Sequence, residues 1–461
     1  MGSGTADAAE RRVGWTIAAL SLGTALNPLN SSMVAVALVA LQQDFQIGVV
    51  EVTWVITVFY IASIVGNPLM GRVIDAFGAR RTFLAGMVVV GVAGAVAPLG
   101  GYGLVLVARG AMAIGSSVAF PAAIALLAPL AEMGRTTPPR LLARIQITNT
   151  TAASLGPVVG GLLIALGGWP AIFFVNVPLT LAALISVAVL APKDVVRTTV
   201  TPAAVLRVLD PAGVLAFGIG TVALLLVVLG AGGEGTWVLI GIGVVALAGF
   251  VVRELRARVP FIDVRLIAAN PALVWTYAAF TAFCVLYYLA LFGLPQLLEE
   301  HGGYSTAVVG LLILPLSAMM IILAPWVART IERRGLAPVL VATAVLLLVS
   351  AAALGVGAVS TAPVPILLLT AVMGVPYCMG SLVMTEAARR VAPPDGVGVA
   401  SGLLQSMRYL GAIAATVVLG RTLSGGVDAA AWVVVTLVAG GAAVVHLVVA
   451  LLAASALRRQ A

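Results

Sequence analysis

The chain has 461 residues, of which 62% are hydrophobic and only 9% are charged, and its mean hydropathy is +1.16. A soluble protein of this length needs far more polar surface to cover its cores, so the composition excludes a soluble enzyme and a nucleic-acid-binding domain. The net charge of +8 is spread in short basic clusters between apolar runs, a pattern that orients membrane proteins. The two histidines lie far apart and both cysteines fall inside apolar runs, so we expect no metal, no cofactor and no disulfide framework.

Apolar runs of about 18 residues or more predict membrane-spanning α-helices. The first run follows Glu10, Arg11 and Arg12 directly and is interpreted as a span rather than as a cleavable signal. The predicted helices lie at 13–40, 52–71, 82–98, 103–127, 145–167, 170–190, 213–230, 237–252, 271–292, 305–327, 338–357, 363–384, 399–420 and 430–456.

The positions of the basic residues test this helix count, because cytoplasmic loops carry an excess of Lys and Arg. With a cytoplasmic amino terminus, only Arg421 of the 25 Lys and Arg falls on the outer side, while Arg109 and Arg408 fall inside helices. With a wrong helix count, the Lys and Arg residues would fall on both sides of the membrane. We therefore expect a multi-pass protein of the inner (cytoplasmic) membrane, with fourteen spans and both termini cytoplasmic.

Two segments between predicted helices repeat each other. Residues 71–78 read Gly-Arg-Val-Ile-Asp-Ala-Phe-Gly after the second helix, and residues 328–335 read Ala-Arg-Thr-Ile-Glu-Arg-Arg-Gly after the tenth. Both copies occupy the same place in a six-helix block, and duplicated halves are a common transporter design. We predict an N-terminal bundle at 1–192, a cytoplasmic link with two inserted helices at 193–265, and a C-terminal bundle at 266–461.

The first copy of this segment has the residues of a tight loop that contacts another helix. Gly71 and Gly78 suit a short turn, and the Asp75 carboxylate can neutralise the N-terminus of a helix in the opposite bundle. The basic pair Arg80 and Arg81 either belongs to this contact or only fixes the topology.

The predicted helix at 145–167 contains Gly156, Pro157, Gly160 and Gly161. Proline removes a backbone hydrogen bond and kinks a helix, and glycines let a second helix approach closely. The spacing therefore predicts a kinked helix that packs tightly against a neighbour.

These segments resemble the major facilitator superfamily, and within it the fourteen-span drug/proton antiporter family, over nearly the whole chain. The resemblance implies an all-α membrane fold of two six-helix bundles plus two inserted helices. It also implies that 71–81 is a conformational latch and that 156–161 is the signature associated with exporters. Further matching positions are Arg109 with Gly115, Gln405 with Arg408 and Gly411, Gly168 and Trp169 with Asn176, and Asp210 with Gly213.

The main departure from the family lies in the first helix, where the family has Leu-Asp and this chain has Leu29 and Asn30. The resemblance implies that a membrane carboxylate at this position exchanges protons for drugs, and here it is an amide. No Asp or Glu falls in a predicted helix core. The remaining coupling candidates are peripheral: Glu51 at the outer mouth of the second helix and Glu386 at the cytoplasmic end of the twelfth.

Two arginines inside predicted spans are expensive to bury and are functional candidates. Arg109 and Arg408 are either satisfied by backbone carbonyls and by Asn, Gln or Tyr, or they give a cavity a positive potential that attracts anionic or electron-rich ligands. Polar and aromatic residues of several helices suit a large, mostly apolar substrate cavity. They are Asn27, Asn30, Asn67, Asn149, Tyr287, Tyr288, Gln296, Tyr377 and Gln405.

The sequence predicts a monomeric secondary transporter that exports hydrophobic, drug-like or antibiotic-like molecules by alternating access. Expected partners are a neutral or anionic apolar substrate, membrane lipids and, where transport is coupled, protons. The alternative is a transporter of lipid-like or anionic metabolites without tight proton coupling. A membrane enzyme is disfavoured because the sequence has neither a Gly-x4-Gly-Lys loop nor an HExxH motif. A channel is disfavoured because a latch implies moving halves.

Overall fold

The computed structural model describes residues 2–134, 136–194, 210–228, 233–257, 260, 262, 264–393, 396–423 and 426–460. All regular elements within these ranges are helices. The chain divides into two compact units. Unit 1 comprises 1–222, 246–263 and 393–406, and unit 2 comprises 223–245, 264–392 and 407–461. Most of the predicted link, from 195 to 209, lies outside the described residues, as does Arg135.

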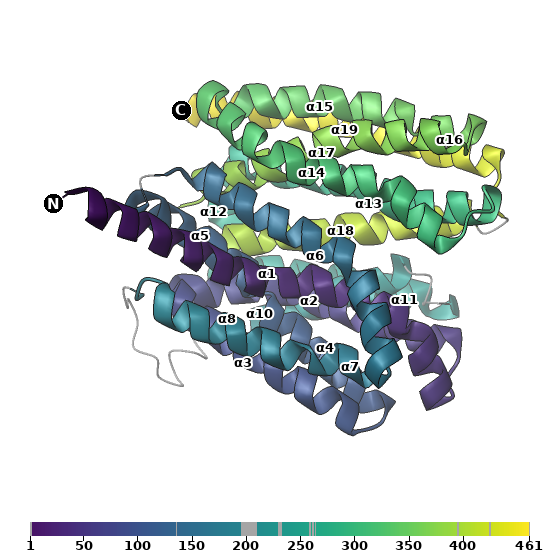
Figure 1. Ribbon diagram of the computed structural model, residues 1–461, viewed down its shortest axis with the longest axis horizontal. Coiled ribbons are helices and arrows are strands. Elements are labelled where there is room, and N and C mark those ends of the chain that lie inside the picture. The colour runs from purple at the N-terminus through teal and green to yellow at the C-terminus, as the bar shows by residue number, and fades with distance from the viewer. Residues whose placement is uncertain are drawn as a thin grey trace. The chain divides into compact units, whose positions relative to one another are not determined.

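Unit 1 is built mainly from the N-terminal helices, with the first turns of α18 added. α1 packs along α6, and α3 packs against α4 and α8 (Figure 1). The helices that lie wholly in this unit are α1 (Gly2–Phe45), α2 (Val49–Phe77), α3 (Ala79–Val96), α4 (Tyr102–Ser116), α5 (Ala119–Met133), α6 (Pro138–Gly167), α7 (Pro170–Phe174) and α8 (Asn176–Leu190), with the 3-10 turn η1 (Ala97–Leu99).

Unit 2 holds most of the C-terminal helices. α19 packs against α13 and α15, and α17 packs against α14 and α15 (Figure 1). The helices that lie wholly in this unit are α12 (Val264–Ala268), α13 (Pro271–Gln296), α14 (Thr306–Arg334), α15 (Leu336–Ala353), α16 (Val356–Val359), α17 (Pro363–Val391) and α19 (Ala429–Gln460), with the 3-10 helix η2 (Gly233–Gly235) and the π-helix η3 (Leu297–His301). Three helices are divided between the units: α10 (Pro211–Val228), α11 (Thr236–Arg256) and α18 (Val397–Thr422).

The helices extend beyond the apolar runs from which they were predicted, and this corrects the placement of the loop at 71–81. Residues 71–77 belong to α2, and only Gly78 separates α2 from α3. Gly78 has φ +97°, and Gly335, which separates α14 from α15, has φ +80°. L-residues with a side chain rarely adopt this conformation, so glycine is needed at both turns. The two copies of the repeat thus share one backbone geometry.

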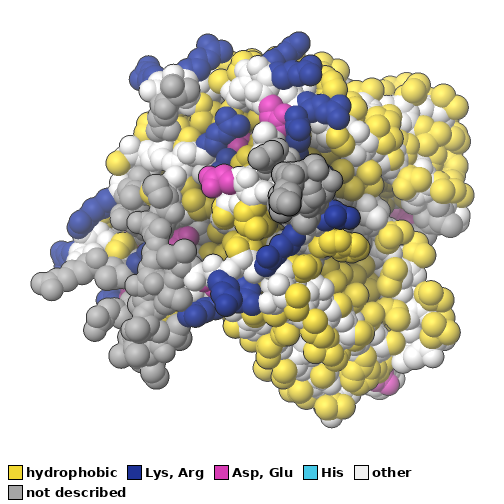
Figure 2. All heavy atoms as spheres, turned by 60° about the vertical axis from the view of Figure 1, so that its left-hand side comes forward, with side chains coloured by type: hydrophobic (Ala, Val, Ile, Leu, Met, Phe, Trp, Pro, Cys, Tyr) yellow, Lys and Arg dark blue, Asp and Glu magenta, His cyan; other side chains and the backbone are white. Residues whose placement is uncertain are grey.

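The surface of the protein is suited to lipid. Many large apolar side chains are exposed, including Leu166 (78%), Trp237 (81%) and Val359 (89%). Figure 2 shows broad yellow areas of hydrophobic side chains with Lys and Arg gathered in separate clusters. Among the described residues, 11 helical stretches are long and apolar enough to cross a membrane, and the number rises to 13 if two bent helices each count as one span. α10 is a shorter apolar helix.

The two bent helices are α1 and α6. α1 bends by 46° between its parts 10–34 and 36–45, and α6 bends by 48° between 138–156 and 158–167. The break in α6 falls at Pro157, as the sequence predicts, because proline cannot donate the backbone hydrogen bond of a straight helix. α1 contains Pro28, but its bend falls at residue 35, about two turns further on.

Candidate functional site

The Asp75 carboxylate lies at the N-terminus of α18. Its Oδ1 accepts a hydrogen bond from the Gly398 N–H (2.8 Å), and its Oδ2 accepts one from the Val399 N–H (2.9 Å). These N–H groups belong to the first turn of the helix and have no partner within it. A negative charge at this end also interacts favourably with the helix dipole. The geometry is that of a helix cap supplied by a residue 323 positions away.

Glycines allow α2 and the first turns of α18 to touch along their backbones. A Cβ atom at Gly71 would collide with the Gly398 carbonyl, and one at Gly402 would collide with the Asn67 carbonyl. The Ser406 hydroxyl donates to the Ile64 carbonyl oxygen (2.8 Å), which extends the contact by one turn. Gly71 therefore serves close helix approach rather than a loop.

The basic pair of the turn faces the end of α8. Arg80 donates from its guanidinium to the Ala188 carbonyl oxygen. The backbone N–H groups of Arg80 and Arg81 both donate to Asp194, and the Arg81 side chain is exposed. Sequence reasoning missed Asp194, which looked like an ordinary charge in a polar link.

The glycines of the α6 signature pack against α1. A Cβ atom at Gly156 would collide with the Ser32 side chain, and one at Gly160 would lie 3.0 Å from the Met33 Cα. Gly161 has open space around it instead. Because Ser32 and Met33 immediately precede the bend of α1, the bent regions of the two helices lie against each other.

Asn30 pairs with another amide. Its Nδ2 donates to the Asn176 Oδ1 (2.6 Å), and the Asn176 Nδ2 donates back to the Asn30 Oδ1 (2.9 Å). Asn176 also donates to the carbonyl oxygens of Ile172 and Phe173 in α7, the short helix that precedes α8. Both side chains are buried, so the pair satisfies polar groups where water is absent.

The two arginines within the helices lie in different units. Arg109 is buried in unit 1, where its Nε donates to the Val55 carbonyl oxygen (3.1 Å) and its guanidinium lies 4.3 Å from the centre of the Phe59 ring. Arg408 is half-buried in unit 2, with its guanidinium 5.8 Å from the centre of the Phe280 ring. Arg109 thus has a backbone partner and an aromatic partner.

The coupling candidates have contrasting surroundings. Glu51 is exposed in the first turn of α2. Glu386 is fully buried in α17, where it accepts hydrogen bonds from Arg389 (2.7 and 2.8 Å) and Arg390 (2.8 Å). Two guanidinium groups compensate this carboxylate, as a buried charge requires.

The remaining cavity candidates are divided between the units. In unit 1, Asn27 donates to Ser116, Asn149 accepts from Thr24, Asn67 donates to the Ser63 carbonyl oxygen, and Gln405 is buried. In unit 2, Tyr287 lies 5.1 Å from both Tyr288 and Tyr377, measured between ring centres. Tyr377 is buried and donates to the Leu286 carbonyl oxygen, while Gln296 is half-buried at the end of α13.

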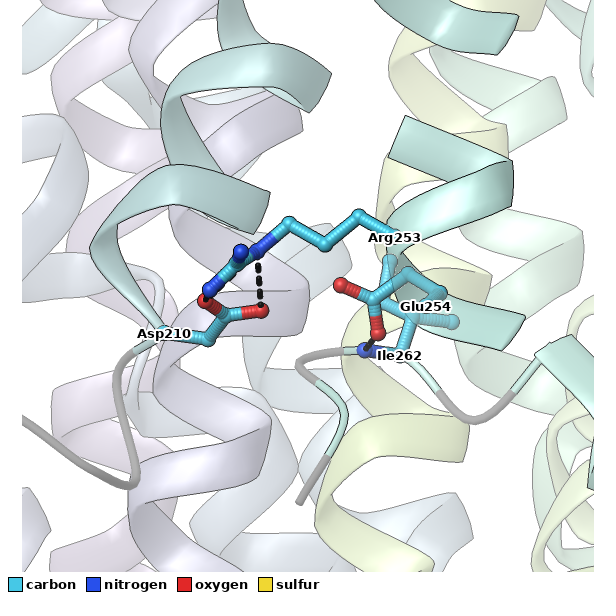
Figure 3. Close-up of polar contacts among 4 residues, drawn as sticks. All are labelled: Asp210, Arg253, Glu254 and Ile262. Atoms are coloured by element: carbon cyan, nitrogen blue, oxygen red, sulfur yellow. Dashed lines mark hydrogen bonds and ion pairs between the residues drawn. The ribbon is translucent and has the colours of Figure 1, made fainter. Parts of the chain in front are cut away.

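A polar network that sequence reasoning missed joins α10, α11 and the segment after α11 (Figure 3). Arg253 donates from its Nε to both Asp210 oxygens (3.0 and 3.2 Å) and forms an ion pair with this carboxylate. The Glu254 Oε2 accepts from the Ile262 N–H (3.0 Å). Because the predicted helix ended at 252, the sequence did not indicate that Glu254 is buried (2% exposed).

Asp210 is also the cap of α10. Burial alone would raise the pKa of its carboxyl group, but hydrogen bonds from Arg253 and the Gly213 N–H, the Arg253 charge and a hydrogen bond with Glu254 outweigh burial and lower that pKa below its usual value. A Cβ atom at Gly213 would meet Asp210 and Glu254 at once, so glycine is needed there.

The chain is similar to known proteins over most of its length. The sequence profile of the Major Facilitator Superfamily matches residues 20–416. The uncharacterized MFS-type transporter YwoD of Bacillus subtilis (strain 168) is 33% identical over 405 residues, which cover 88% of this chain and 89% of YwoD. The tetracenomycin C resistance and export protein of Streptomyces glaucescens is 29% identical over 425 residues, which cover 88% of this chain and 75% of that protein.

A solved structure gives the same picture of the fold. The proton:xylose symporter XylE, bound to 6-bromo-6-deoxy-D-glucose, superposes with a TM-score of 0.66 over 94% of this chain and 95% of that chain. The identity is 14%, so this likeness concerns the fold alone.

Proposed function

Because the chain belongs to the major facilitator superfamily, a family of membrane transporters and not a class of enzyme, we propose that it exports hydrophobic, drug-like or antibiotic-like molecules by alternating access. The export protein for tetracenomycin C supports the direction and the substrate class, since it matches 88% of the chain. The cap that Asp75 provides to α18 supports alternating access. A helix cap is worth roughly 0.5–2 kcal/mol, enough to favour one conformation and small enough to be released.

The proposed topology has fourteen spans with both termini cytoplasmic, in the inner membrane. The 13 candidate spans and the short apolar helix α10 support this number, and the distribution of arginines supports the orientation. An accessible tag near Gly233 should react from outside intact cells, and a tag near Ala203 only after permeabilisation. If both tags react from the same side, the fourteen-span topology is wrong.

The proposed substrates are neutral or anionic amphiphiles, and the transporter acts as a monomer. Asn30 stands where the family has a carboxylate, and Arg109 and Arg408 are retained within the helices. A cation in such surroundings meets positive charge that a low dielectric screens poorly. Proton coupling, where present, is weak and runs through a carboxylate outside the helix cores predicted from the sequence, such as the exposed Glu51 or the buried Glu386. Transport of lipid-like or anionic metabolites without tight coupling is the second candidate, and the same charges favour it.

Transport into proteoliposomes separates these cases. Uptake of neutral, anionic and dicationic fluorescent amphiphiles is measured with and without an imposed pH gradient. We expect uptake of neutral and anionic probes that responds little to the gradient, and poor uptake of dications. Strong gradient-driven transport of cations would overturn the proposed specificity and leave drug/proton antiport of the usual kind. Absence of transport for every drug-like probe, together with transport of anionic lipids, would favour the second candidate.

A further inference from the structure

The turn between α2 and α3 is capped by a carboxylate from the end of the N-terminal helices. The Asp194 Oδ1 accepts from the Arg80 N–H (2.9 Å), and its Oδ2 accepts from the Arg81 N–H (2.9 Å). Both donors lie in the first turn of α3, where no partner exists within the helix. Asp194 follows α8 by four residues and begins the link toward the inserted helices.

Gly78 makes room for this carboxylate. A Cβ atom at Gly78 would collide with the Asp194 side chain, in addition to the strain from its positive φ. The matching turn of the repeat provides a comparison, because Gly335 has a positive φ too but has nothing within 4 Å of the corresponding Cβ position. Within the described part of the chain, a carboxylate thus lies against the glycine of the first turn but not against that of the second.

The same turn carries the latch contact. Asp75 lies on α2 one turn before Gly78 and caps α18 through the N–H groups of Gly398 and Val399. The Arg80 guanidinium also binds the carbonyl oxygen of Ala188 in α8. The end of α8, the Gly78 turn and the start of α18 thus form one continuous set of contacts inside unit 1.

We infer that Asp194 is a positioning residue of the latch: by capping α3 it holds the Gly78 turn in the place from which Asp75 reaches α18. The Asp75 contact uses both carboxylate oxygens, and a hydrogen bond weakens steeply when distance and angle change. A small shift of the turn therefore removes at least one of the two bonds.

Asp210 at the other end of the link is the matched control. It also caps a helix and is bound by an arginine, but its contacts are with α10 and α11 and not with the Gly78 turn. Loss of either aspartate removes a cap of the same chemical kind. Only the loss of Asp194 should increase amide exchange at the N-terminus of α18.

Hydrogen exchange of backbone amides in the full-length protein, read by mass spectrometry, tests the inference without transport. In Asp194→Ala, peptides containing residues 80–81 and peptides containing 398–399 should both exchange roughly tenfold faster, the change expected for the loss of a cap. Asp194→Asn keeps one acceptor oxygen and should give a smaller change in both peptides. Asp210→Ala should leave both peptides at the wild-type rate.

Faster exchange at 80–81 with unchanged exchange at 398–399 would show that Asp194 caps α3 and does not position the latch. Unchanged exchange at both places, in both Asp194 variants, would show that it does neither. A second readout rests on the proposed function: Asp194→Ala should lower the turnover number for export and leave KM unchanged. If the wild-type protein exports none of the probes, the proposed function fails, while the exchange experiment still decides the inference.

Discussion

The side-chain amides of Asn30 and Asn176 exchange two hydrogen bonds in the contact between α1 and α8. Replacing Asn30 with Ala leaves the Asn176 amide without its interhelical partner in a buried place, which costs roughly 1–3 kcal/mol. We expect a lower thermal unfolding midpoint for Asn30→Ala in detergent. Asn27→Ala removes a longer bond to Ser116 (3.3 Å) and should shift the midpoint less. Equal shifts for the two variants would show that the amide pair stabilises the fold no more than the bond from Asn27 to Ser116 does.

Asn30→Asp restores the carboxylate that the family has at this position, and so it tests proton coupling rather than stability. The Asn176 Nδ2 can still donate to one carboxylate oxygen, but the other oxygen replaces the donor that faced the Asn176 Oδ1, so the second hydrogen bond exists only when the carboxyl group carries a proton. A carboxyl group inside a membrane protein is a group that can carry a proton. We expect transport by Asn30→Asp to respond to an imposed pH gradient more strongly than transport by the wild type. No gain in gradient response would count against position 30 as the missing coupling site.

Asp75→Asn should slow transport while the protein still inserts and folds. An asparagine has one acceptor oxygen, so one of the two α18 N–H groups loses its partner, at a cost of roughly 0.5–2 kcal/mol to the capped conformation. Asp428→Asn is the control, since Asp428 caps α19 through the Ala431 N–H (2.7 Å). Both variants should lose some stability, and only Asp75→Asn should lose turnover. Undiminished turnover in Asp75→Asn would remove the latch role.

The bend of α6 offers a matched set of three substitutions. Gly156→Ala places a methyl group against Ser32 of α1, whereas Gly161→Ala places one in open space. Gly156→Ala should therefore reduce transport and stability, by about 1–3 kcal/mol as for other overpacked contacts, and Gly161→Ala should do neither. Pro157→Ala should straighten α6 and slow exchange between conformations with normal expression. Wild-type transport by both Gly156→Ala and Pro157→Ala would show that the signature has no function in this chain.

The Asp210 cap predicts a dependence of stability on pH. Its pKa is lower in the folded protein than the ordinary value of 3.8, so its contribution is present above about pH 3.8 and is lost as pH falls through the lower folded value. Asp210→Asn should lower stability by about 1 kcal/mol at pH 7, since Arg253 is half exposed and screened by water. The difference from wild type should shrink below pH 3.8. A gap that stays constant down to pH 3 would contradict the assignment.

Sequence reasoning predicted the all-helical membrane fold because apolar length and Gly and Pro positions are local properties of the chain. It ended the second helix at 71, where Arg72 interrupts the apolar run, and so described 71–77 as part of a loop. In the structure these residues remain helical, because a membrane helix need not stop at the edge of the apolar layer. The same rule ended α11 at 252 and missed Glu254, which is buried near Asp210 and Gly213 at the start of α10.

Spacing alone indicates contacts of the candidate site only where the partners are close in sequence, whereas the long-range contact of Asp75 with a helix N-terminus was expected from the family resemblance of 71–81. Glu386 lies three and four residues before Arg389 and Arg390, a spacing that places all three on one side of a helix. Asn30 and Asn176 are 146 residues apart, and Asp194 is more than a hundred residues from the turn that it caps. No local pattern marks either pairing, since each depends on which helices pack together.

The Asp75 cap also bears on how the protein is made. Its two partners are separated by 323 and 324 residues, so most of the polypeptide must be synthesised before the first turn of α18 can meet this carboxylate. Contacts of such long range form late, because the entropy of closing the intervening chain must be overcome first. Closure of this cap is therefore expected to mark one of the last steps of biogenesis, when N-terminal and C-terminal helices first recognise each other.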